Sequence, residues 1–270
     1  MNPLVVVIPS RSASNLAVSI PAVRKHEPDA RIIVVDDGVD WCEFRERVTV
    51  GMEDWWSRES NEKCAVIPGV KPFVFARNVN IGMRAAGEDS DCVILNDDAI
   101  LQTPGGFSIL QAASAEDERI GIIGAVTDLT GQPLQCRKRN VVIEEAARHA
   151  PSYGLRAVEH IAFVCVLIPA RTRRKLDEFA PQYPSLLTGG FLDERFTAYG
   201  SDDLDACWQC ARVSLCVCVH DGCYVDHGSL RSSYRGAPTT AGDIWPNHRI
   251  LRAKWGMPPN PADPEQRRRV

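Results

Sequence analysis

The sequence predicts an α/β fold in which a mostly parallel central sheet is flanked by helices, with a smaller mixed region in the second half. Five short runs in the first half are apolar throughout, which is typical of strands buried on both faces of a parallel sheet. Helical segments separate the runs, as strand–helix alternation requires. The runs are LVVVIP at 4–9, RIIVV at 31–35, CAVIP at 64–68, CVILN at 92–96 and IGIIGAV at 120–126.

The remaining elements follow from local pattern. Helices or loops are expected between the runs, at 15–26, 41–48, 75–88 and 105–119. The second half predicts an extended or hairpin region, a buried strand at 161–170, a basic helix at 171–180 and one or two short strands within 214–236. A glycine-marked loop leads into a further helix that Ser201 or Asp202 is expected to cap.

Composition narrows the class of protein. The chain has 270 residues, of which 44% are hydrophobic and 24% charged, as in ordinary soluble proteins. Its net charge of −4 argues against an extended nucleic-acid-binding surface. No run approaches the roughly 20 apolar residues of a membrane span. The N-terminus has no charged segment before an apolar stretch, so no secretory signal is expected and a cytoplasmic location is predicted.

The ten cysteines are expected to be reduced thiols, because no secretory signal places the chain in an oxidising compartment. Five of them lie within 207–223, and Cys207 and Cys210 have C-x-x-C spacing. A zinc site that adds a later cysteine or His220 is an alternative. However, the pair lies in a helical pattern and CVCV alternates as a strand does, which favours simple packing of the thiols.

Polar residues follow three of the predicted strands. Pro9, Ser10 and Arg11 come after the first strand, DDG after the second, and NDD after the fourth. Ligands of open α/β sheets bind beyond the carboxyl ends of the strands, so these residues are expected to share a site. Adjacent carboxylates repel each other, and a divalent cation with oxygen ligands offsets that repulsion. A solvated turn is the simpler alternative for each pair.

Six segments occur in one order along the chain: VVVIPSR, IIVVDDG, FARNVNIG, VILNDDA, YGSDDLDAC and VDHGSLRSS. In this order they resemble the nucleotide-sugar-dependent glycosyltransferases of the GT-A fold, in particular family two, over roughly residues 4 to 235. The resemblance implies a single catalytic domain at 1–255, with a nucleotide-binding half at 1–127 and an acceptor half at 128–255. Residues 256–270 then form a Pro-rich, charged tail.

The resemblance also implies a nucleotide pocket. Carboxylates accept hydrogen bonds from base N–H groups and ribose hydroxyls, and Asp37 is expected to contact the nucleobase. Arg77 is expected near the diphosphate, where charge-assisted hydrogen bonds hold phosphate. The expected nucleotide-sugar-binding residues are Pro9, Ser10, Arg11, Asp36, Asp37, Arg77, Asn78, Asn96 and Asp97.

A divalent cation is expected beside this pocket. The family motif D-x-D becomes Asn96-Asp97-Asp98 here, so its first acid is missing. By resemblance Asp98 ligates Mn²⁺ or Mg²⁺ and His227 completes the site, while Asn96 or Asp97 faces the ribose. Ser229 and Arg231 are expected in a loop near the diphosphate.

Acids before and within YGSDDLDAC are expected on the acceptor side. The resemblance makes Asp203 the catalytic base of an inverting transfer, with Asp202 positioning the acceptor. Asp193 and Glu194 match an acceptor-side loop. The alternative is a run of acids in the first turn of a helix, which the helix dipole favours without any function.

The predicted function is transfer of a sugar from a nucleoside-diphosphate sugar, a UDP-sugar first, to an acceptor hydroxyl. The acceptor stays open between glycan, lipid, protein and a modified DNA base. Basic groups admit an anionic acceptor, namely Arg137 to Arg139, Arg171 to Lys175 and Arg267 to Arg269. A sugar-nucleotide pyrophosphorylase is one alternative, but VIPSRSASN lacks the glycine-rich loop. A noncatalytic binding module is another.

Overall fold

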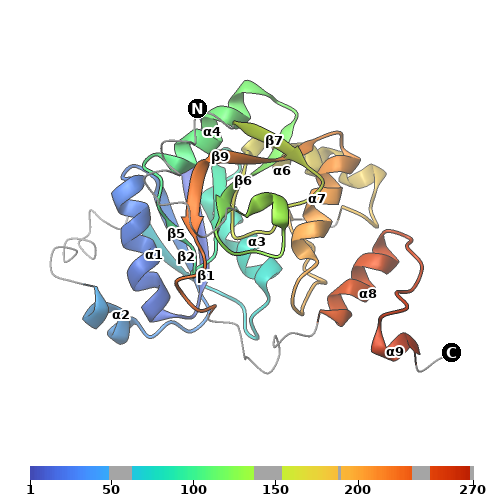
Figure 1. The fold of residues 1–270 in the computed structure, drawn as a ribbon, viewed down its shortest axis with the longest axis horizontal. Coiled ribbons are helices and arrows are strands. Elements are labelled where there is room, and N and C mark those ends of the chain that lie inside the picture. The colour runs from blue at the N-terminus through green and yellow to red at the C-terminus, as the bar shows by residue number, and fades with distance from the viewer. Residues whose placement is uncertain (49–62, 137–153, 188–189, 233–243, 268–270) are drawn as a thin grey trace.

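A computed structural model describes residues 1–48, 63–136, 154–187, 190–232 and 244–267. Its centre is a nine-stranded sheet with helices on both faces (Figure 1). The strands are β1 (Leu4–Ser10), β2 (Arg31–Asp36), β3 (Cys64–Pro68), β4 (Asp91–Leu95), β5 (Ile100–Leu101), β6 (Ile120–Thr127), β7 (Leu155–Val158), β8 (Cys165–Ile168) and β9 (Cys216–Asp226). The five strands predicted in the first half are therefore confirmed.

The helices lie between the strands and after them. They are α1 (Ala13–His26), α2 (Trp41–Arg47), α3 (Phe75–Ala86), α4 (Gly106–Glu116), α6 (Ala170–Phe179), α7 (Asp202–Arg212), α8 (Trp245–Lys254) and α9 (Pro264–Arg267). Two short 3₁₀ helices span Pro133–Gln135 and Ala180–Gln182. Residues 214–226, where one or two short strands were expected, hold the single long strand β9, whose pairing is irregular beyond His220.

The sheet is mixed, in the order β3-β2-β1-β4-β8-β6-β9-β5, with β7 also paired to β9. β1 to β4 pair in parallel, and β6 pairs in parallel with β9. β8 inserts antiparallel between β4 and β6, with Leu167 opposite both Val93 and Ile123. A fully apolar strand gives no sign of its direction, so the sequence does not reveal this insertion.

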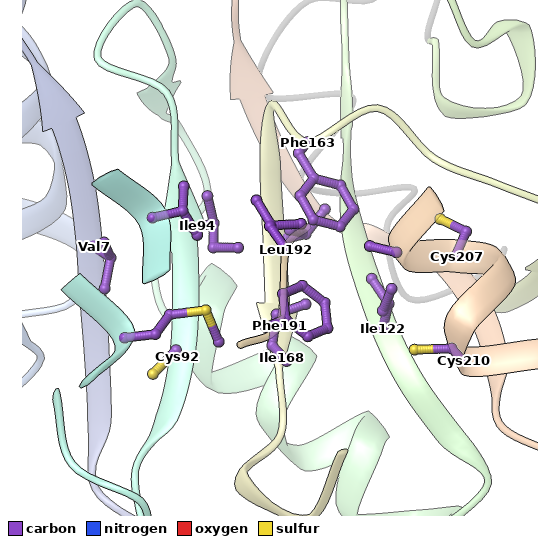
Figure 2. Close-up of a cluster of buried hydrophobic side chains, with 14 of the residues drawn as sticks. Val7, Cys92, Ile94, Ile122, Phe163, Ile168, Phe191, Leu192, Cys207 and Cys210 are labelled. Atoms are coloured by element: carbon purple, nitrogen blue, oxygen red, sulfur yellow. The ribbon is translucent and has the colours of Figure 1, made fainter. Parts of the chain in front are cut away.

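Two apolar layers cover the two faces of the sheet. Alternate residues of β1 point to opposite faces, with Val5 and Val7 on one and Val6 and Ile8 on the other. The first layer packs α3, α6 and α7 on the sheet, and the second packs α1 and α4. In Figure 2 the first layer runs from the strands to Cys207 and Cys210 of α7, past Phe163, Phe191 and Leu192. One continuous core therefore joins the two halves of the chain.

Two local features fix helices against the carboxyl edge of the sheet. Ser12 caps α1, and its Oγ accepts a hydrogen bond from the Asn15 N–H at 3.2 Å. Only two residues therefore separate β1 from α1, which carries Asn15 at that edge. Gly82 allows α3 to approach β1, because a Cβ at this position would lie 2.2 Å from a Val7 methyl carbon. Both contacts place the residues that follow β1 beside those that follow β4.

Candidate active site

A cavity of about 600 Å³ opens at the carboxyl edge of the sheet. Its walls come from the ends of β1 and β4, the segment after β6, the segment before α7 and the segment after β9. Seven of the residues predicted for the site line it together: Pro9, Asn96, Asp97, Asp98, Asp202, Asp203 and His227. Residues far apart in the sequence therefore meet in one place, as the order of motifs predicts.

Asp97 is buried and held by two side-chain donors. Ser10 Oγ donates to one carboxylate oxygen at 2.7 Å, and Asn15 Nδ2 donates to the other at 3.3 Å. The Asn15 amide also donates to the Arg231 carbonyl at 3.0 Å, so it ties the segment after β9 to the end of β4. No local pattern marks Asn15 as part of a site, and its role depends on residues more than 80 positions away.

Asp98 faces His227, and the two predicted metal ligands are adjacent. His227 Nε2 lies 3.3 Å from Asp98 Oδ1. The Nδ1–H of His227 donates to the Leu129 carbonyl at 2.6 Å, and its backbone N–H donates to Asp128 Oδ1 at 2.8 Å. Burial opposes protonation of His227, but the Asp98 carboxylate and the Leu129 carbonyl outweigh it and raise the pKa of the imidazole.

This pair fits a divalent cation. Because Leu129 accepts the proton on Nδ1, the neutral imidazole directs its Nε2 lone pair toward Asp98, where a cation would take the place of the proton that Asp98 favours. A carboxylate oxygen and an imidazole nitrogen are an acceptable donor set for Mn²⁺ or Mg²⁺. Within the described residues no group of three or more His, Cys, Asp or Glu side chains converges on one point. The remaining ligands of such an ion would be phosphate oxygens and water, as is usual for Mg²⁺ with nucleotides.

The second pair of acids begins α7. Gly200 and Ser201 both have left-handed backbones, with φ values of 74° and 73°, and α7 starts at Asp202. Ser201 occupies the predicted cap position, but its side chain makes no capping hydrogen bond. Burial raises the pKa of Asp202 to about 7, and the Asp203 charge adds to the shift. Burial also raises the pKa of Asp203, whose Oδ1 accepts the Leu204 N–H at 2.8 Å.

His160, which no sequence motif singled out, lines the cavity together with Asp203 and Gln132. Gln132 Oε1 accepts the Leu134 N–H at 3.2 Å, so the amide nitrogen is the end that faces His160. That nitrogen lies 2.8 Å from His160 Nε2. Nε2 is therefore the acceptor, and a neutral His160 carries its proton on Nδ1.

Comparison with known proteins adds to this geometry. No family model and no curated protein matches the chain. Among solved structures, the chain is similar to a crystal structure of GalNAc-T7 with UDP, GalNAc and Mn²⁺, with 14% identity and a TM-score of 0.63. The chain has the GT-A fold. The match covers 93% of this chain and 48% of the other, so the chain spans about half the length of that relative.

The two acids at the end of β2 have different surroundings in the GT-A sheet. Asp36 is part of the turn, since its carboxylate accepts hydrogen bonds from the Trp41 indole and from two backbone N–H groups. Although burial opposes them, these bonds hold the pKa of Asp36 below its usual value. Asp37 Oδ1 is buried and accepts no hydrogen bond from any described residue. Burial raises the pKa of Asp37 against the opposing charges of Lys71 and Arg11. Asp37 as the nucleobase contact stays a prediction.

Four further predicted residues lie outside the lining of the GT-A cavity. Arg77 Nε is 3.8 Å from Glu194, which also accepts a hydrogen bond from the Asn80 amide at 3.1 Å. The buried Asn78 accepts the Val70 N–H at 2.9 Å. Asp193 accepts hydrogen bonds from Arg195 at 2.6 Å and from the Lys254 ammonium at 2.9 Å. Although burial opposes it, this pairing holds the pKa of Asp193 well below its usual value.

Ser229 and Arg231 also lie beside the cavity rather than in its wall. Ser229 donates its N–H and its hydroxyl to the two oxygens of Asp226, at 3.0 and 2.6 Å. The Arg231 carbonyl accepts the Asn15 amide. Both contacts shape the segment that follows His227, and neither tests the predicted role at the diphosphate.

Two arginines of the Arg171–Lys175 group, which was expected to admit an anionic acceptor, bind backbone carbonyls. Arg171 donates to the Ser114 and Ile120 carbonyls at 2.6 and 2.9 Å, and Arg173 donates to the Gly87 carbonyl at 3.0 Å. Arg171 and Arg173 thus satisfy carbonyls in the last turn of α4, at the start of β6 and just after α3. The Arg137–Arg139 group lies outside the described residues, as does the chain beyond Arg267.

The thiols pack as the sequence predicts. Cys207 and Cys210 are buried in α7, and every cysteine is free. Cys216 and Cys218 have sulfur atoms 3.9 Å apart on β9, and burial raises the pKa of Cys218 to about 12. Within the part of the chain described, no metal-binding cluster includes them. None of the described helices is both long and apolar enough to cross a membrane.

Proposed function

We propose that this chain is a metal-dependent glycosyltransferase that transfers a sugar from a nucleoside-diphosphate sugar, a UDP-sugar first, to an acceptor hydroxyl. One observation carries the proposal: the Asp98–His227 pair and the Asp202–Asp203 pair line the same cavity. Its volume of about 600 Å³ lies in the usual range for small-molecule sites. The fold shared with an enzyme whose structure holds UDP and Mn²⁺ supports the same class of donor and cofactor.

Asp98 and His227 would hold Mn²⁺ or Mg²⁺. When bound, the ion neutralises charge on the diphosphate and so makes it a better leaving group. Leu129 and Asp128 fix the imidazole, and Ser10 and Asn15 fix the neighbouring Asp97. These contacts orient the ligands before the donor arrives, which lowers the cost of binding.

Asp203 is the base in this proposal. Its Oδ1 is occupied by the Leu204 N–H, so the other oxygen is available to take the proton from the acceptor hydroxyl. The hydroxyl oxygen then forms a bond to the anomeric carbon as the bond from that carbon to the diphosphate breaks. A pKa raised by burial brings Asp203 closer to the working pH, where a general base is most effective.

Two neighbours of Asp203 support the acceptor. Asp202, with a pKa of about 7, keeps a proton over part of the neutral range and donates a hydrogen bond to the acceptor. His160, with its proton on Nδ1, offers a second neutral donor to a substrate oxygen. Family two, the inverting outcome and Asp37 as the nucleobase contact belong to the same proposal, while the acceptor stays open.

The test is calorimetric titration of UDP, then GDP, each with and without Mn²⁺. We expect one nucleotide to bind, and only with the metal. Asp98→Ala should abolish the metal-dependent binding, because it removes the carboxylate that lies 3.3 Å from the imidazole Nε2 of His227. Asp89→Ala is the matched control, since that acid is exposed and pairs with Arg174 on the surface. If neither nucleotide binds under any condition, the proposal fails.

A further inference from the structure

Helix α8, near the C-terminal end of the chain, contacts both sides of the point where Asp202 and Asp203 begin α7 (Figure 1). At one end of α8, Asn247 reaches the loop that precedes α7. At the other end, Lys254 and Trp255 reach Asp205 in the first turn of α7. No sequence motif pointed to α8, and none of its residues lines the cavity.

Asn247 is fully buried, with 0% of its surface exposed, and both ends of its amide are used. Its Oδ1 accepts the Ala198 N–H at 3.0 Å. Its Nδ2 donates to the carbonyls of Ala198 at 2.9 Å and of Gly200 at 2.7 Å. One side chain therefore satisfies three backbone groups of a loop whose residues 197–201 all line the cavity. A buried amide with this many backbone contacts defines the path of the loop.

The loop needs such a partner. Gly200 and Ser201 take left-handed backbones in succession, and a non-glycine residue in this region persists only when its surroundings impose it. The Ser201 side chain makes no capping hydrogen bond, so it does not hold the turn itself. The Gly200 carbonyl that Asn247 binds lies immediately before the turn that directs Asp202 and Asp203.

The first turn of α7 is held from the same helix. The Lys254 side chain is 1% exposed, and its ammonium lies 2.7 Å from Asp205 and 2.9 Å from Asp193. The Trp255 indole donates to the other Asp205 oxygen at 2.8 Å. Because these contacts fix Asp205, the direction of Asp202 and Asp203 depends on the path of the 197–201 loop that precedes them.

We propose that Asn247 is a positioning residue of the active site, which acts by fixing the 197–201 loop and thereby the direction of Asp202 and Asp203. It touches neither substrate nor metal. The inference rests on the proposed transferase function for its consequence, but its structural part stands on the three hydrogen bonds alone.

The experiment compares the whole protein with Asn247→Ala and the isosteric Asn247→Asp, which leaves no cavity. The matched control is Asn260→Ala, which removes the contact to His248 in the same C-terminal region. Hydrogen exchange of the Ala198 amide, affinity for UDP with Mn²⁺, and hydrolysis of UDP-glucose, UDP-N-acetylgalactosamine and GDP-mannose are measured for each. In Asn247→Ala we expect faster exchange at 197–201, because the Ala198 N–H loses its acceptor, together with unchanged UDP affinity and about 10²-fold slower hydrolysis of the active donor. Asn247→Asp keeps an acceptor for the Ala198 N–H but loses both donations to carbonyls, so we expect the same slower hydrolysis at unchanged UDP affinity. Asn260→Ala should match the wild type.

Each outcome decides the inference. Unchanged exchange at Ala198 in Asn247→Ala, or unchanged hydrolysis with exchange increased, overturns it. Equal losses of UDP affinity and hydrolysis also overturn it, because they indicate general destabilisation rather than misdirected acids. If the wild type hydrolyses no nucleotide sugar and binds no UDP, the proposed function fails instead. In that case the inference says only that Asn247 fixes the 197–201 loop, and the exchange rates alone support or refute it. If Asn247→Ala does not fold, Asn247→Asp decides the inference through its hydrolysis rate and UDP affinity, since its Ala198 N–H keeps an acceptor.

Discussion

The cavity contains two Asp-Asp pairs that the chain holds in opposite ways. At the end of β4, side chains surround the acids: Ser10 and Asn15 donate to Asp97, and His227 faces Asp98. At the start of α7, the acids rely on backbone N–H groups, as in the bond from Leu204 to Asp203. Burial then raises the pKa values of both Asp202 and Asp203. In the proposed function the same dipeptide would bind a cation in one place and accept a proton in the other.

This difference follows from what surrounds each pair rather than from the acids themselves. Donors and a nearby imidazole favour a charged carboxylate, whereas an apolar environment penalises it. A base that must accept a proton gains from the second environment, and a metal ligand gains from the first. The comparison therefore assigns different chemistry to the two ends of the cavity, and each assignment is open to a separate test.

The largest effect is expected for Asp203→Asn. Removal of the base should lower turnover of the donor by about 10² to 10⁴-fold while the affinity for UDP with Mn²⁺ is retained. The asparagine is isosteric and still accepts the Leu204 N–H, so the start of α7 should keep its geometry. Steady-state rates and calorimetric affinities measure the two effects.

Asp202→Asn is the companion variant for this test. We expect it to lower turnover less than Asp203→Asn, because it removes a positioning group and not the base. A reversed order would assign the base to Asp202. Retention of wild-type turnover in both variants would remove the acids of α7 from the chemistry.

The two ends of the cavity also differ in how far the sequence predicts them. The apolar runs specify β1, β2 and β4, and the acids that follow them fall where parallel strands end. The antiparallel entry of β8 has no such signature, because a strand buried on both faces reads alike in either direction. Asn15, His160 and Asn247 are isolated polar residues whose partners lie far along the chain. Only the folded structure assigns them a role.

The next effect concerns stability, and it follows from the raised pKa of Asp202. The native state keeps a proton that the unfolded chain releases near the ordinary pKa of 3.8, because the pKa of Asp202 in the folded state is about 7. The stability from this group is therefore fully present below the unfolded value and is lost as pH rises through about 7. Asp202→Asn should remove this loss, worth up to about 4 kcal/mol.

Urea unfolding at pH 5, 6, 7 and 8 measures the loss. The variant should show a flatter decline of unfolding free energy with pH than the wild type. Asp89→Asn, at an exposed acid, is the control and should keep the wild-type slope. If Asp202→Asn keeps that slope as well, Asp202 is not the group that binds the proton.

The smallest of these effects is expected at the metal end, for Asp128→Ala. Asp128 accepts the backbone N–H groups of His227 and Gly228 at 2.8 and 3.1 Å, so it fixes the imidazole without touching the ion. Loss of such an outer contact lowers metal affinity by about 10 to 100-fold. Electron paramagnetic resonance of free Mn²⁺ during a titration measures the change.

Asp226→Ala is the matched control for that variant, because Asp226 lies in the same segment but its carboxylate accepts hydrogen bonds from Ser229 and not from the His227 N–H. We expect its Mn²⁺ affinity to stay at the wild-type value. An equal loss in both variants would mean that the segment after β9 softens as a whole. No loss in Asp128→Ala would mean that the Leu129 carbonyl alone orients His227, since that contact to Nδ1 survives the substitution. Either result would mean that the side chains at the metal end are held less firmly than their hydrogen bonds indicate. The difference between this end of the cavity and the acids of α7 would then be smaller.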